Sequence, residues 1–123
     1  MLIAQPVTAG RFEEGYAAFR AGDGARAIAH WSPLAEGGNV DAQVHIAYLY
    51  RRGVGVQADP ERAFHWYRRA ALQGSADARY ELALMYELGI GTPADIDEAQ
   101  YWYGLATEEA CPGELSSSGG LVD

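Results

Sequence analysis

Two stretches of this chain repeat each other: residues 38–71 read GNVDAQVHIAYLYRRGVGVQADPERAFHWYRRAA, and residues 74–107 read GSADARYELALMYELGIGTPADIDEAQYWYGLAT. They align at an offset of 36 residues without a gap, and 13 of the 34 aligned pairs are identical. Chance would give about three identities in a chain so rich in Ala and Gly. A period in this range predicts a solenoid, in which each unit buries its apolar face against its neighbours and leaves an extended surface.

The repeated positions are mostly small residues, glycines and aromatic residues, a mixture that suits the packing of helices. Small residues let two helices approach closely, while aromatic side chains fill the space between helix pairs. We therefore predict structural roles for the recurring residues Ala42, Ala47, Tyr50, Gly53, Gly55, Asp59, Ala63, Trp66, Ala78, Ala83, Tyr86, Gly89, Gly91, Asp95, Ala99 and Trp102.

Each copy has the pattern of two helices joined by a Gly-rich turn. Asn39 and Ser75 stand where the N-cap of the first helix belongs, and Gly53 and Gly89 stand where that helix should end. The second helix is expected after Asp59 and after the matching aspartate 36 residues later, since an aspartate there can cap the helix. The sequence thus predicts two antiparallel helix pairs in tandem.

A third, divergent helix pair precedes the two copies. Residues 23–36 share several positions with the second helix of the following copy, and Phe12, Tyr16 and Phe19 form an apolar stripe at helical spacing in residues 11–21. Three helix pairs reach the usual minimum for a stable stack. We therefore predict an all-α solenoid domain of residues 11–109, divided into a capping pair at 11–37 and repeats at 38–73 and 74–109.

Both ends of the chain fall outside this pattern. Residues 1–10 are expected to be a frayed N-terminus or the remnant of a signal peptide, because Val7-Thr8-Ala9 suits a signal-peptidase site. Residues 110–123 contain a Ser- and Gly-rich stretch and are expected to form a flexible tail. The single cysteine, Cys111, cannot form an internal disulfide, so stability must come from packing.

Composition and charge argue against several classes of function. The formal net charge is −8 and the pI is near 4.7, so the chain offers no cationic field to nucleic acid or to anionic membrane. No apolar run approaches the roughly 20 residues that span a bilayer, and no membrane insertion is expected. Half of the net charge lies in residues 108–123, so the repeats themselves imply no basic partner.

The residues that catalysis or metal binding requires do not occur in the required patterns. His30, His45 and His65 never stand three or four residues apart, and the sequence contains no Gly-x-Ser-x-Gly motif. The loop 53–58 resembles a dinucleotide-binding loop, but it follows a helical segment and recurs, which favours a structural turn. We therefore expect no enzyme activity, no catalytic residues, no metal and no cofactor.

The repeated stretches resemble the Sel-one-like repeat, a 36-residue relative of the tetratricopeptide repeat. The resemblance rests on the runs 38–43, 53–56 and 66–71, and on their second copies in register. It implies a right-handed α-α superhelix that serves as an adaptor for another protein or peptide. An alternative comes from secreted, Cys-rich relatives linked to small-ligand or β-lactamase-like penicillin binding, from which a chain with one cysteine departs.

In tetratricopeptide-type stacks the first helix of each pair lines the inner curve, so its non-repeating positions are candidates for partner binding. In each copy, three such positions share one face of the first helix. They are Val44, Tyr48 and Arg51 in the first copy and Tyr80, Leu84 and Glu87 in the second. They predict an apolar and aromatic floor with one positive and one negative charge, which suits an amphipathic helix or an extended peptide. Packing of these side chains against the next helix pair is the alternative, and the sequence leaves both open.

Three classes of function remain: an interaction scaffold, a small-ligand binder, and a fragment that dimerises through residues 95–107. The tandem repeat favours the scaffold, expected as a monomer or weak dimer whose partner is a protein or peptide. The compartment stays open between the bacterial cytoplasm and the periplasm, with export expected if residues 1–10 derive from a signal peptide.

Overall fold

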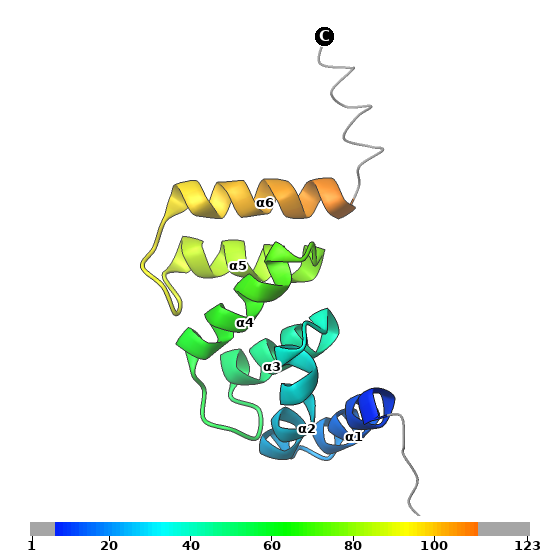
Figure 1. Ribbon diagram of the computed structural model, residues 1–123. Coiled ribbons are helices and arrows are strands. Elements are labelled where there is room, and N and C mark those ends of the chain that lie inside the picture. Colours follow the sequence, from blue (N-terminus) through cyan, green and yellow to red (C-terminus); the bar gives the residue numbers. More distant parts are fainter. Residues whose placement is uncertain (1–6, 111–123) are drawn as a thin grey trace, which may run out of the picture.

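The computed structural model describes residues 7–110, with side chains described from residue 12 to residue 107. This part of the chain holds six helices and no strand, which confirms the all-α fold. Figure 1 shows the helices stacked in chain order, from α1 at the bottom to α6 at the top. They are α1 (Val7–Arg20), α2 (Gly24–Glu36), α3 (Val40–Arg52), α4 (Pro60–Leu72), α5 (Ala76–Leu88) and α6 (Ile96–Ala110).

The outermost helices are longer than their sequence patterns indicate. Helix α1 begins at Val7, ahead of the expected residue 11, and α6 continues to Ala110, where a tail is expected to begin. Adding a residue to the end of an existing helix is the favourable propagation step, so a helix anchored by packing extends past its apolar stripe. The rest of the expected tail, with Cys111, and residues 1–6 lie outside the described residues.

The two copies of the repeat have the same backbone shape. Gly53 ends α3 with φ 70° and ψ 43°, and Gly89 ends α5 with φ 70° and ψ 44°, both in the left-handed region. The Asn39 side chain accepts a hydrogen bond from the Ala42 backbone N–H, and Ser75 caps α5 in the same way. The predicted starts and ends of the first helices are thus confirmed.

The second helices begin at the predicted aspartates. The carboxylate of Asp59 accepts from the backbone N–H of Arg62, and Asp95 caps α6 in the same manner. The backbone N–H of Asp59 also donates to the carbonyl of Tyr50 at 2.9 Å, and the matching bond joins Asp95 to α5. Each aspartate therefore starts its own helix and ties it to the preceding helix of the pair.

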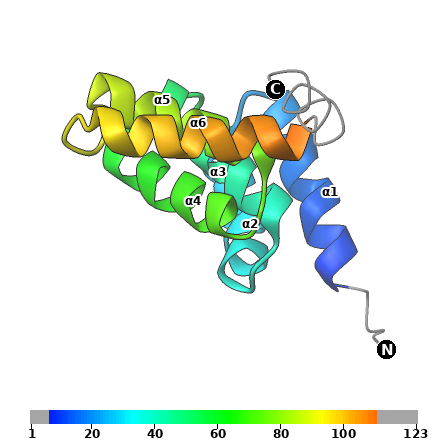
Figure 2. The ribbon, with the colours of Figure 1, turned by 90° about the horizontal axis from the view of Figure 1, so that it is seen from above.

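The core runs along the stack as a continuous seam between consecutive helices. Each helix makes its main contacts with the helices before and after it in the chain, and Figure 2 shows α5 and α6 lying side by side. Small side chains keep the helices close, while larger side chains fill the space between them. The recurring residues that are buried are Ala42, Ala47, Ala63, Trp66, Ala78, Ala83, Ala99 and Trp102.

Two recurring glycines let neighbouring helix pairs touch through their backbones. An added Cβ at Gly55 would lie 2.2 Å from the backbone nitrogen of Gly24, in the turn that starts α2. An added Cβ at Gly91 would lie 2.3 Å from the carbonyl oxygen of Pro60, at the start of α4. The loop of each repeat therefore rests on the start of the second helix in the preceding pair, and no side chain fits between them.

A buried glutamine joins the N-terminal pair to the first full repeat. Gln43 has no exposed surface, and its Nε2 donates to the carbonyl of Ala35 near the end of α2 at 3.0 Å. Its Oε1 accepts from Nε2 of Gln73 at 3.1 Å. At the same position of the next repeat, Nε of Arg79 donates to the carbonyl of Ala71 at 3.0 Å. The two different side chains perform the same task of binding the end of the preceding helix.

Replacing this glutamine tests the junction between the pairs. Gln43→Ala removes both hydrogen bonds and leaves space in the core, so we expect the free energy of unfolding to fall by about 2 kcal/mol. Gln73→Ala is the matched control, because it removes only the more exposed hydrogen bond and should cost less than about 1 kcal/mol. Urea unfolding followed by circular dichroism measures both, and equal losses would contradict the assigned role.

Candidate partner-binding site

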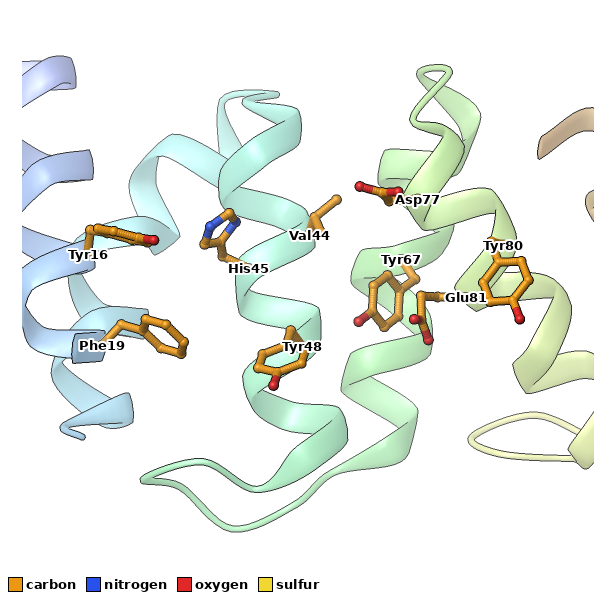
Figure 3. Close-up of a pocket in the computed structure, with 9 residues that line it drawn as sticks. All are labelled: Tyr16, Phe19, Val44, His45, Tyr48, Tyr67, Asp77, Tyr80 and Glu81. Carbon is orange, nitrogen blue, oxygen red and sulfur yellow. The ribbon is translucent and has the colours of Figure 1, made fainter. Parts of the chain in front are cut away.

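A cavity of about 390 Å³ opens between the first helices of the three pairs. Helix α1 contributes Tyr16 and Phe19, α3 contributes Val44, His45 and Tyr48, α5 contributes Asp77, Tyr80 and Glu81, and α4 contributes Tyr67. Figure 3 shows these side chains facing the space between the three helices. The volume falls in the range of ordinary ligand pockets, and its lining is mainly aromatic and apolar.

The cavity brings together half of the six partner-binding residues expected from the sequence. Val44, Tyr48 and Tyr80 line it, and the two tyrosines are 40% and 52% exposed. Val44 is half-buried and also packs against the core. It therefore both lines the candidate binding surface and packs against neighbouring helices, the two alternatives that the sequence left open. Leu84 is half-buried as well, but it lies outside the lining.

The positive charge expected on this surface is already paired. Nη1 of Arg51 lies 2.8 Å from Oε1 of Glu81, and both side chains are partly buried. The pair links α3 to α5 beside the cavity. Glu81 belongs to the lining of the cavity, whereas Arg51 does not.

The negative charge expected on this surface lies farther along the stack. Oε1 of Glu87 accepts a hydrogen bond from the hydroxyl of Tyr103 at 2.7 Å, between α5 and α6. Burial raises the pKa of Tyr103 to about 12, and the hydrogen bond to Glu87 adds to this effect. The ring of Tyr103 meets the ring of Tyr80 edge-on at 5.5 Å. This contact holds one wall of the cavity against α6.

Tyr67 forms the floor of the cavity. The sequence could not distinguish this position from an ordinary core position. Its side chain belongs to the predicted buried stripe of α4, and only 2% of the residue is exposed. Burial raises the pKa of Tyr67 well above its usual value; the Glu81 carboxylate raises it further, while Arg51 opposes the shift. The neutral hydroxyl is therefore the form present at ordinary pH.

The sequence analysis assigned none of the remaining lining residues to a binding surface. Tyr16 and Phe19 belong to the expected apolar stripe of the capping pair, and Phe19 meets Tyr48 edge-on at 6.4 Å. His45 packs edge-on against Trp31 at 5.0 Å, and its Nδ1 lies 2.7 Å from the carbonyl of Asp41. Since a carbonyl only accepts, Nδ1 carries the proton. Of these contacts, only the one between Phe19 and Tyr48 depends on how α1 sits against α3.

The model of the family described as "Sel1 repeat" matches residues 40–75 and 76–110. The chain belongs to the Sel1 repeat family. The two matched units begin two residues later than the divisions at 38 and 74 expected from the sequence, and the divergent N-terminal pair lies outside both. A search of curated proteins finds no match to this chain.

Solved structures of Sel1 repeat proteins share the fold. One is the crystal structure of c5321, described as a protective antigen of uropathogenic Escherichia coli strains with an SLR fold; it has a TM-score of 0.79 and 30% identity over 82% of this chain. Another is a Sel1 repeat protein from Oxalobacter formigenes, with a TM-score of 0.73 and 37% identity over 80% of this chain. The chain spans 22% and 40% of the lengths of these two proteins.

None of the helices within residues 7–110 combines the length and the hydropathy that crossing a bilayer requires. Among residues 12–107, no group of three or more His, Cys, Asp or Glu side chains is placed to hold a metal ion. Sel1 repeats generally act as protein–protein interaction modules, and the fold is generally a non-catalytic scaffold.

Proposed function

We propose that this chain is an interaction module that holds a peptide or helical segment of another protein in the cavity between α1, α3 and α5. The observation that carries the proposal is the exposure of Tyr48 and Tyr80 on an apolar, concave surface. Tyrosine is enriched at the anchor points of protein interfaces, because its ring offers large apolar contact area and its hydroxyl stays hydrated.

A neighbouring hollow extends the surface toward the end of the stack. Tyr80 and Asp77 line both the cavity and a second hollow between α5 and α6. The second hollow is completed by Tyr103, Ala76, Ala106 and Thr107. A continuous path therefore runs across α1, α3, α5 and α6, which supports an elongated partner segment rather than a compact one.

Selection of peptide ligands and truncation of the two tyrosines test this proposal. Peptides are selected from a displayed random library with the full 123-residue chain, and their affinities are measured by isothermal titration calorimetry. Each tyrosine is expected to contribute as an interface anchor, so Tyr48→Ala combined with Tyr80→Ala should weaken binding at least about 30-fold.

The matched control is Tyr101→Ala, which truncates a tyrosine of α6 that is 60% exposed and lies outside the cavity. Its affinities should stay within about twofold of the original chain, because the side chain makes no part of the proposed surface. Circular dichroism confirms that all variants keep their helices. Unchanged binding by the double variant, or an equal loss with Tyr101→Ala, would remove the proposal.

A further inference from the structure

The charges around the cavity are unevenly distributed. Among the described residues that line it, two carry carboxylates, Asp77 and Glu81, and none is Lys or Arg. Three arginines lie nearby, but each is engaged by the protein itself: Arg51 pairs with Glu81, while Arg20 and Arg52 lie 5.6 Å from the ring centroids of Tyr16 and Tyr48. The cavity therefore presents to an incoming group the carboxylate of Asp77 and the already paired carboxylate of Glu81.

Asp77 differs from the other carboxylates of the site because its own side chain has no partner. Within the described part of the chain it makes no ion pair and accepts no side-chain hydrogen bond. It lies in the first turn of α5 and borders both the cavity and the neighbouring hollow. A cation bound there would meet a carboxylate that is free to pair.

The hydroxyl of Tyr67 is a second, independent sign of a ligand. The residue is 98% buried, yet among residues 12–107 its hydroxyl has no hydrogen-bond partner. No buried side-chain nitrogen or oxygen among residues 12–107 lacks a hydrogen-bond partner, so the unpaired oxygen of Tyr67 is the part of this side chain that reaches the cavity surface. Figure 3 shows the ring between α3 and α5 with its oxygen turned into the cavity. A ligand in the cavity is in position to hydrogen-bond this hydroxyl in place of water.

The aromatic lining suits a cation with an apolar stem. The faces of tyrosine rings attract ammonium and guanidinium groups, and this attraction strengthens when water is excluded. The long stems of Lys and Arg pack well against apolar surface while the charged head stays polar. Tyr48 and Tyr80 offer such surface, and Asp77 and Glu81 stand beside it.

We propose that the cavity selects a basic peptide segment and takes up one Lys or Arg side chain of that segment. The stem lies between Tyr48 and Tyr80, the charged head pairs with Asp77, and the hydroxyl of Tyr67 hydrogen-bonds the bound segment. The inference rests on the proposed function, because it names the chemistry of the partner that the interaction module holds.

The selected peptides provide the first test. We expect Lys or Arg to be enriched at one position, and replacement of that residue by norleucine, which keeps the stem and removes the charge, to weaken binding about tenfold or more. Peptides that depend on Tyr48 and Tyr80 but show no such enrichment, or bind equally well with norleucine, would overturn this inference and leave the proposed function standing. If no peptide depends on the two tyrosines, both proposals fall.

Two variants with matched controls provide the second test. Asp77→Asn should weaken binding of a selected peptide about tenfold, whereas Asp41→Asn, at the same position of the preceding repeat and outside the cavity, should change it less than twofold. Tyr67→Phe should weaken binding about fivefold without lowering the melting temperature, because the lost hydroxyl makes no hydrogen bond within residues 12–107.

The control for the hydroxyl is Tyr50→Phe, outside both the cavity and the neighbouring hollow, where the hydroxyl accepts a hydrogen bond from Nη1 of Arg62 at 3.1 Å. That variant should leave the affinity for the selected peptide within about twofold. Equal effects of Asp77→Asn and Asp41→Asn on affinity would contradict the assigned cation position. Unchanged affinity with Tyr67→Phe would contradict the assigned hydrogen bond.

Discussion

Trp31→Ala is expected to lower the free energy of unfolding by about 3–5 kcal/mol, the usual cost of removing a fully buried large aromatic side chain. The indole has no exposed surface, and its ring lies 5.8 Å from that of Phe12 and 6.3 Å from that of Phe19. Its Nε1 also donates to the carbonyl of Phe12 at 3.1 Å. The substitution therefore removes one of the main contacts between α1 and α2.

Urea unfolding followed by circular dichroism measures this loss, with the exposed Tyr101→Ala as the control. The control should change the free energy of unfolding by less than about 0.5 kcal/mol, as surface substitutions commonly do. Because Tyr16 and Phe19 of α1 line the cavity, Trp31→Ala should also weaken peptide binding. A loss of stability no larger than that of the control would contradict the role given to Trp31.

Gly55→Ala is expected to cost about 3 kcal/mol or more, for two separate reasons. The residue has φ 70°, a left-handed conformation that strains any residue with a side chain. In addition, the new Cβ would lie 2.2 Å from the backbone nitrogen of Gly24 and 2.7 Å from the carbonyl oxygen of Gly22. Both of those atoms belong to backbone that is held by the start of α2, so the clash cannot be relieved by turning a side chain.

Gly38→Ala separates the two reasons. Gly38 also has a positive φ, at 102°, but an added Cβ there meets no atom within 4 Å. It should therefore report the conformational strain alone, at about 1–2 kcal/mol. If urea unfolding gives equal losses for the two variants, the close contact between helix pairs at Gly55 does not govern stability.

The features that could be predicted from the sequence are those determined by short segments. Asn39 and Ser75 start helices because their side chains bond the backbone three residues later, and Gly53 ends one because it adopts a left-handed conformation. Each of these choices involves only a few neighbouring residues. Their recurrence at 36 residues then gave the number of helices and the order in which they stack.

The features that could not be predicted join residues far apart in the chain. The Arg51–Glu81 pair spans 30 residues, and whether it forms depends on how far α5 is rotated about its axis relative to α3. No periodicity in the sequence reports that rotation. The sequence predicted one positive charge on the surface but not the ion pair with Glu81 that neutralises it.

The 36-residue period contains one further signal, an aromatic position that also occurs in the divergent helix pair. Trp31 stands 36 residues before Tyr67, and Tyr67 stands 36 residues before Tyr103, so the three occupy one position of successive second helices. In the structure Trp31 is buried among the aromatic residues of the first pair, and Tyr67 lies at the floor of the cavity. Extending the alignment to the divergent pair would have marked this position as aromatic throughout.

Occupation of the cavity by a partner segment can be observed by nuclear magnetic resonance of the chain with ¹³C-labelled tyrosine rings. The eight tyrosines report separately on the cavity and on the rest of the molecule. On addition of a selected peptide, the ring signals of Tyr16, Tyr48, Tyr67 and Tyr80 should shift while those of Tyr50, Tyr86 and Tyr101 stay unchanged. Shifts confined to the second group would show that the peptide binds outside the cavity.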